Sequence, residues 1–123
     1  MNSKILMTIS AIVLAVPGLG ALFAPQEFLT YLGAPPSGYL PALVQLFAAA
    51  LLGLAMINWA VKGSKVGGIY NRPIAVGNLM HFTVGAFTMV HVSMRGHVQP
   101  VIIAITVIYA LLAIAFGAVV FRG

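Results

Sequence analysis

The sequence predicts an all-α integral membrane protein, an up-down four-helix bundle with a short interfacial helix between spans one and two. Three observations predict it: 62% of the 123 residues are hydrophobic and 6% are charged, mean hydropathy is +1.10, and long apolar runs follow one another with short connections. A helical span needs about 20 apolar residues, so residues 1–123 form a single transmembrane domain of four spans. These are expected at about 4–24, 39–61, 73–94 and 100–121, with the interfacial helix at about 25–32.

Span one begins after Lys4 and contains Pro17 followed by glycine, which predicts a kink or an end in its outer third. Lys4 and the apolar stretch after it also resemble a secretory signal. We interpret the segment as a retained first span.

The interfacial helix has its own start and stop signals. Pro25 stands at its first position, Glu27 in its first turn and Gly33 just after its end. Its aromatic and aliphatic side chains suit the boundary between lipid and water, where amphipathic helices lie flat. A stiff, proline-rich turn over residues 34–38 then leads into span two.

The remaining boundaries are marked in the same way. A flexible, basic loop follows span two, and Asn71 is expected to cap span three, with Pro73 in its first turn. Gly96 closes span three and Pro100 opens span four. Because such short connections make sequential spans antiparallel, an up-down bundle follows.

The distribution of charge predicts the orientation. With the N-terminus in the cytoplasm, the charged residues on the outer side are Arg95 and Glu27, the sole acid of the chain. We expect these two residues to form a surface ion pair. The positive-inside rule then favours a membrane protein with both termini in the cytoplasm. Lys62, Lys65 and Arg72 are expected to contact anionic lipid headgroups. The basic residues on the inner side are Lys4, Lys62, Lys65, Arg72 and Arg122.

Composition excludes several classes of site. The chain has no cysteine, so disulfides, thiolate metal sites and cysteine nucleophiles are absent. The net charge of +5 would suggest a nucleic-acid ligand in a soluble protein, but here it is interpreted as a topology signal and no nucleic-acid partner is expected. No Ser-His-Asp set, phosphate loop or pair of carboxylates is present, so we predict no catalytic residue and no metal site, and an enzyme is disfavoured.

Polar residues follow one face of span three. Together with Gly85 and Val92 they recur at spacings of three and four, which places the set within about a third of the helix circumference. Because polar groups are costly in hydrocarbon, this stripe is expected to face the bundle interior. Its members are Asn78, His81, Gly85, Thr88, Val92 and Arg95, with His91 at the edge.

Matching depth between antiparallel spans proposes partners for the stripe. Asn58 lies near the level of Asn78, and Gln45 near the level of Thr88 and His91. Tyr109, Thr106 and Ser10 are expected within a turn or two of His81. The candidate ligand-binding residues are therefore His81, Asn78, Thr88, His91, Gln45, Asn58 and Tyr109.

Other interpretations of these residues stay open. They also fit structural hydrogen bonds between helices, each worth about 0.6 kcal/mol in membranes. His81 and His91 are ten residues apart, about 15 Å along one helix, so they cannot clamp one haem iron, although a symmetric dimer can use His81 twice. His97 is interpreted as a hairpin residue. Small residues such as Gly77 and Gly85 suit close helix packing or a homo-oligomer face.

Three stretches resemble small four-span bacterial proteins that are loosely similar to the DoxX-like group: residues 23–29, 58–63 and 67–78, the last with His81. The resemblance implies a small bacterial inner-membrane protein and no particular chemistry. The spans depart from DoxX itself in having no acidic residue.

The leading hypothesis is a small polytopic membrane protein that binds a lipid-like or small ligand in a polar pocket on span three, or serves as an accessory subunit. Alternatives are an oligomeric channel or facilitator lined by the stripe, and a redox anchor for quinone, haem or pigment. The expected partners are the bilayer and its anionic headgroups, with a homo-oligomer or a larger membrane complex as further possibilities. The cofactor is left unassigned.

Overall fold

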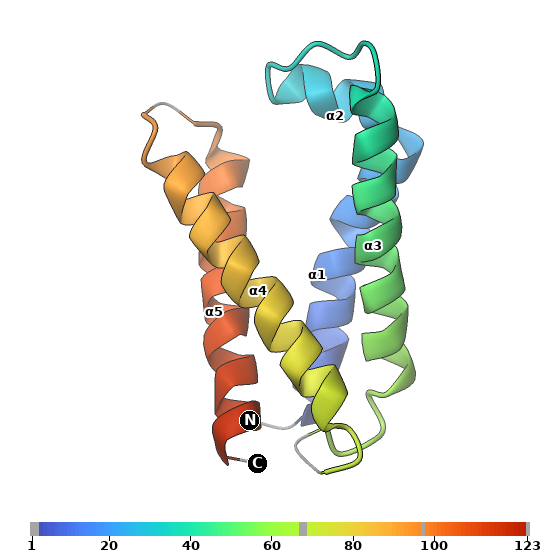
Figure 1. Cartoon of the computed structure of the whole chain (residues 1–123), viewed down its shortest axis with the longest axis vertical. Helices are drawn as coiled ribbons and strands as arrows, with labels where there is room; N and C mark the ends of the chain where they lie inside the picture. The colour runs from blue at the N-terminus through green and yellow to red at the C-terminus, as the bar shows by residue number, and fades with distance from the viewer. Residues whose placement is uncertain (1–2, 67–68, 97, 123) are drawn as a thin grey trace. The chain divides into compact units, whose positions relative to one another are not determined.

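The computed structural model of the chain describes residues 3–66, 69–96 and 98–122, and over these residues it consists of five helices without strands (Figure 1). The predicted all-α fold class is confirmed, and the long helices α1, α3, α4 and α5 are apolar enough to cross a membrane, which is consistent with a bundle. Each expected segment ends within one residue of the observed helix. The helices are α1 (Ser3–Phe23), α2 (Pro25–Tyr31), α3 (Leu40–Ala60), α4 (Arg72–Ser93) and α5 (Pro100–Arg122).

Proline and glycine explain why the helix ends fall where they do. Prolines stand in the first turns of α2, α3, α4 and α5, where a helix has no use for the missing N–H. After α2, Gly33 adopts φ +82°; its N–H donates to the Thr30 carbonyl (3.0 Å) and the Ala34 N–H donates to the Leu29 carbonyl (2.9 Å). This pair of bonds is the Schellman arrangement, which ends a helix at a left-handed glycine.

Two local expectations are corrected. Of the kink or end predicted at Pro17, the end is wrong, because helix α1 continues to Phe23, and the kink stays a prediction. Asn71 stands before α4, but its side chain does not cap the helix. The Asn71 amide donates instead to the Lys65 carbonyl at 3.0 Å, so it stabilises the preceding loop.

The chain divides into two compact units. The α1–α3 unit comprises Met7–Val61, and the α4–α5 unit comprises Lys62–Gly123 together with Met1–Leu6. The start of α1 therefore belongs to the α4–α5 unit, where the Ser3 hydroxyl donates to the Ser64 carbonyl at 3.4 Å.

In the α1–α3 unit, α1 and α3 run antiparallel and α2 packs against α3 (Figure 1). A Cβ added to Gly18 of α1 would lie 3.1 Å from the Leu52 side chain of α3. Glycine at this position thus allows the close approach of the two helices. The most enclosed apolar side chains here are Met7, Ala11, Leu14, Ala21, Ala48 and Leu51.

In the α4–α5 unit, α4 and α5 form an antiparallel hairpin (Figure 1). Phe82 and Phe116 are fully buried and stack with ring centroids 5.6 Å apart. Two polar contacts flank this aromatic core near the ends of the hairpin. The Arg72 guanidinium donates to the Val120 carbonyl at 3.2 Å, and the Ser93 and Thr106 hydroxyls lie 3.2 Å apart.

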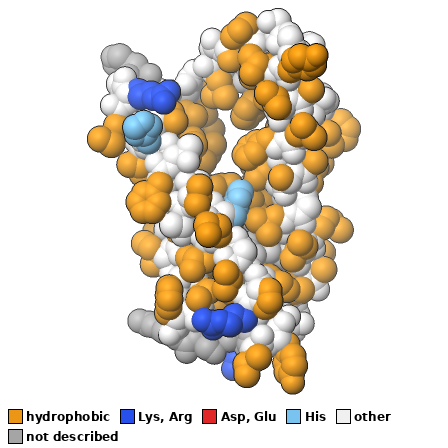
Figure 2. Space-filling model, viewed as in Figure 1, with side chains coloured by type: hydrophobic (Ala, Val, Ile, Leu, Met, Phe, Trp, Pro, Cys, Tyr) orange, Lys and Arg blue, Asp and Glu red, His pale blue; other side chains and the backbone are white. Residues whose placement is uncertain are grey.

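The outer surfaces of the helices are largely apolar. Figure 2 shows hydrophobic side chains spread along them, with Lys and Arg side chains only near helix ends on the visible face. Exposed apolar side chains are costly in water but suit hydrocarbon, so these surfaces fit a lipid environment. Among the most exposed are Phe87, Ile114, Met56, Leu46 and Val16.

Candidate functional site

A histidine–tyrosine pair lies in the middle of the α4–α5 hairpin. His81 Nε2 and the Tyr109 hydroxyl are 2.9 Å apart, within hydrogen-bonding distance. His81 is about 14 Å along α4 from Arg72 and about 18 Å from Ser93, by the rise of an α-helix. The pair is therefore near the midpoint of a helix of membrane-spanning length.

Aromatic rings enclose this pair on the side of the hairpin core. Phe82 meets both rings edge-on, with centroids 5.0 Å from His81 and 4.8 Å from Tyr109. Gly85 lies against the phenol ring, because a Cβ at that position would be only 2.5 Å from two ring carbons of Tyr109. Since ordinary carbon contacts are about 3.5–4.0 Å, the Tyr109 ring fits only because residue 85 has no side chain.

The second ring nitrogen of His81, Nδ1, has no hydrogen-bond partner among the described residues. Over the described residues, the bond to Tyr109 is the one hydrogen bond that His81 makes. No enclosed side-chain nitrogen or oxygen in this part of the chain lacks a partner, so Nδ1 is not sealed inside the protein. His81 is half-buried, and its Nδ1 is not fully enclosed.

Asn78, one turn before His81 on the same face, is fully buried. Its amide donates to the Ile74 carbonyl of its own helix at 2.9 Å. Gly77, which precedes it, is exposed, and a Cβ there would meet nothing within 4 Å. A helical side chain leans toward the N-terminus of its helix, so His81 leans toward the open space beside Gly77.

The outer half of the predicted stripe differs from the inner half. Thr88 is exposed and its hydroxyl donates to the Val84 carbonyl at 2.9 Å. His91 and Arg95 are also exposed. The structure thus brings Tyr109 to His81 as expected, but Thr88 and His91 take no part in that pair.

Two more of the candidate residues make contacts inside the α1–α3 unit. The Gln45 amide donates to the Leu22 carbonyl at 3.2 Å, and this carbonyl is in the last turn of α1, where it has no intrahelical donor. The buried Asn58 amide donates to the Ser10 hydroxyl at 3.0 Å. The proposed matching of Gln45 and Asn58 with residues of α4 stays a prediction.

Thr106 is engaged elsewhere than at His81. Its hydroxyl donates to the Ile102 carbonyl at 2.7 Å and lies beside Ser93, nearer the turn between α4 and α5. The predicted proximity of Ser10 to His81 spans the two units and stays a prediction.

Of the residues expected to contact headgroups, Lys62 and Lys65 lie in the loop before α4 and Arg72 is the first residue of α4. Arg72, interpreted as a headgroup contact, also binds within the protein, because its guanidinium donates to the last turn of α5. A cation at a helix C-terminus is stabilising. Lys65 is exposed and Lys62 half-buried, so headgroup contacts stay a prediction for all three residues.

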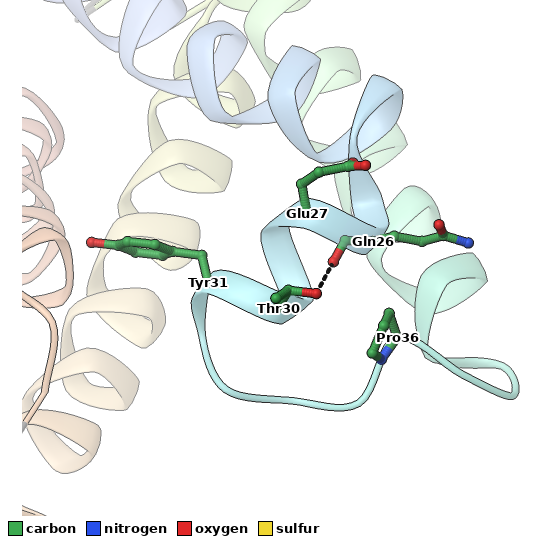
Figure 3. A pocket seen from close by; sticks show the side chains of 5 residues that line it. All are labelled: Gln26, Glu27, Thr30, Tyr31 and Pro36. Atoms are coloured by element: carbon green, nitrogen blue, oxygen red, sulfur yellow. Dashed lines mark hydrogen bonds between the residues drawn. The ribbon is translucent and has the colours of Figure 1, made fainter.

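A shallow hollow surrounds Glu27 on α2 (Figure 3). It has a volume of about 460 Å³ and is formed by α2 with Pro36 of the following turn. The Thr30 hydroxyl donates to the Gln26 carbonyl at 2.9 Å beside it. Glu27 and Arg95 are each exposed in separate units, so their ion pair stays a prediction, and His97 lies outside the described residues.

Sequence reasoning found His81 and Tyr109 but missed Phe82, which contacts both rings, and Phe116, which stacks on Phe82. The signal available was the position of Phe82 directly after His81, because neighbouring positions on a helix are 100° apart and both can face an adjacent helix. Residue 116 carried no comparable signal.

The described residues contain no group of three or more His, Cys, Asp or Glu side chains able to hold a metal ion. Searches against protein-family models, curated proteins and solved structures found no match to this chain.

Proposed function

We propose that this chain is a small polytopic protein of the bacterial inner membrane that binds a lipid-like or small apolar ligand beside His81, alone or as an accessory subunit of a larger complex. The observation that carries the proposal is the His81–Tyr109 pair at mid-helix, with Nδ1 of His81 left accessible.

The physical reason for a ligand beside His81 is that its side chain lies in apolar surroundings. A polar atom without a hydrogen-bond partner is costly in hydrocarbon. One nitrogen of His81 is satisfied by Tyr109, and the other needs a partner from outside the described contacts. A bound molecule with a polar group at this depth supplies that partner, whereas a purely structural histidine gains nothing from an accessible Nδ1.

The location rests on the sequence. Five basic residues on one side against one on the other favour a cytoplasmic location of both termini. The resemblance to small four-span, DoxX-like bacterial proteins agrees with an inner membrane. In that orientation Lys62, Lys65 and Arg72 are at the cytoplasmic surface, where they attract anionic headgroups.

The test is native mass spectrometry of protein released gently from its own membrane, with an absorption spectrum of the same sample. We expect a bound small molecule in the wild type and its loss in His81→Leu. The matched control is His91→Leu, which removes an exposed histidine from the same helix and should keep the ligand. A folded wild-type protein without any bound molecule or partner chain would refute the proposal.

An oligomeric channel is the second candidate. It is favoured by the exposure of Thr88 and His91, which extend the polar face of α4 beyond His81. A channel predicts flux through protein-containing liposomes that falls in Thr88→Val. A redox anchor for haem or pigment predicts a coloured protein, and quinone predicts a bound quinone in the mass spectrum.

A further inference from the structure

We infer that His81 presents Nδ1–H as a hydrogen-bond donor, so that the ligand of this site is an apolar molecule carrying a carbonyl oxygen. The inference rests on the proposed function, because it specifies the chemistry of the molecule that binds beside His81.

The direction of the hydrogen bond between His81 and Tyr109 depends on which of their atoms carry protons. A neutral imidazole has one N–H and one acceptor nitrogen, and a phenol has one O–H donor. If the Tyr109 hydroxyl donates to Nε2, the imidazole proton is on Nδ1. If the imidazole is protonated, both nitrogens carry a proton and Nδ1 is again a donor.

The one arrangement that makes Nδ1 an acceptor has Nε2–H donating to the Tyr109 oxygen. In that case the Tyr109 proton needs another acceptor. Over the described residues the phenol makes no second hydrogen bond. An unsatisfied O–H at this depth is costly, whereas an unused lone pair on the phenol oxygen is a smaller loss, so the phenol donates and Nδ1 keeps its proton.

The position of the phenol is well defined. Gly85 lies against one side of the Tyr109 ring, and Phe82 meets it edge-on with centroids 4.8 Å apart. Because the ring is confined between these residues, its hydroxyl stays directed at Nε2. Gly85 is therefore a positioning residue that sets which nitrogen of His81 faces the ligand.

The space for a ligand is beside Gly77. His81 leans toward it, and a Cβ at residue 77 would meet nothing within 4 Å. The flanking side chains of Met80 and Val84 are exposed and apolar. An apolar molecule fits these surroundings, and its polar group must accept the Nδ1 proton without adding a donor that has no acceptor nearby. A ketone, ester or quinone carbonyl meets both conditions, while an alcohol meets only the first.

The first experiment needs no substitution. NMR of protein labelled with ¹⁵N in its histidines, in lipid bicelles, reports which nitrogen of His81 carries the proton, with His81→Asn used for assignment. We expect a proton on Nδ1 in the wild type. A neutral imidazole with its proton on Nε2 would overturn the inference while leaving the proposed ligand site standing.

The second experiment compares two probes of the same size, dodecanophenone and dodecylbenzene, which differ in the carbonyl. We expect the ketone to bind about three- to tenfold tighter, the effect of one hydrogen bond, and to shift the His81 Nδ1–H signal. Gly77→Leu, which fills the open space without touching the phenol, should abolish this shift. His81→Asn places an amide where Nδ1 was and should retain part of the ketone preference, and His81→Leu should lose it.

The outcomes separate the carbonyl inference from the proposed ligand site. If native mass spectrometry detects a bound molecule but both probes bind equally well, the carbonyl requirement alone is refuted. Binding of neither probe, together with a native mass spectrum free of ligand, would refute the proposed function itself.

Discussion

Substitution of Gly85 by alanine is expected to destabilise the α4–α5 hairpin because the added methyl group has no space. Its carbon would be 2.5 Å from Cδ2 and Cε2 of Tyr109, about 1 Å or more inside an ordinary contact. The ring cannot simply rotate away, because it is held by its contact with Phe82 and by its bond to His81. The two helices must separate or the phenol must leave Nε2.

The magnitude follows from three contributions. Overpacking of this kind costs about 2 kcal/mol, and loss of the His81–Tyr109 bond adds about 0.6 kcal/mol. Replacing a helical glycine by alanine returns roughly 0.5–1 kcal/mol. The free energy of unfolding should therefore fall by about 2 kcal/mol for Gly85→Ala, as the sum of these terms.

The assay is reversible unfolding in mixed micelles with increasing SDS, followed by circular dichroism. Gly77→Ala is the matched control on the same helix, because nothing lies within 4 Å of the added carbon, and it should be neutral or slightly stabilising. In a Tyr109→Leu background the cost of Gly85→Ala should largely disappear. If Gly85→Ala were as stable as Gly77→Ala, the close packing of α4 against Tyr109 would be wrong.

Three further predictions concern the other polar contacts and the orientation. A double-mutant cycle of Asn58→Leu and Ser10→Ala should give a coupling of about 0.6 kcal/mol, measured by the same SDS titration; additive effects would contradict their hydrogen bond. Arg72→Gln should speed amide hydrogen exchange in the last turn of α5 around Val120, because a cation that caps this end is lost, and exchange elsewhere in α5 serves as the control. A reporter protein that is active only in the cytoplasm should be active when it is fused to the C-terminus. Activity of a reporter that works only outside the cytoplasm would refute the predicted orientation.

The sequence predicted the helices well because their ends depend on local chemistry. Proline in the first turn and glycine after the last act through the backbone of a few residues, so α2 could be bounded by Pro25 and Gly33 without knowledge of the rest of the fold. Pro17 shows the limit of such signals. A proline inside a long apolar helix is tolerated in a membrane, and α1 continues past it.

The contacts of the candidate site were harder to predict. Depth along a span follows from residue number, but the rotation of each helix about its axis does not. Tyr109 was correctly placed near His81 by depth alone. Gln45 donates to the Leu22 carbonyl of α1, a contact that depth did not predict, because the open carbonyls at a helix end compete for any nearby amide. Its match by depth to span three stays a prediction.

Small residues show the same limit. Gly77 and Gly85 look alike in the sequence, yet one faces open space and the other faces the Tyr109 ring. Their difference depends on which side of α4 meets α5, and that is decided by the packing of Phe82 and Phe116. The pattern of residues along the chain does not show which side of α4 meets α5.

The polar contacts of the α4–α5 hairpin also determine how this pair of helices is able to move. One is near each end and one is in the middle, so sliding α5 along α4 by one turn, about 5.4 Å, breaks all of them together. Motions that keep these contacts intact move α4 and α5 together as one rigid body, without sliding of one helix along the other. A displacement at any one of these contacts is therefore shared by both helices along the hairpin, through Arg72–Val120, His81–Tyr109 and Ser93–Thr106.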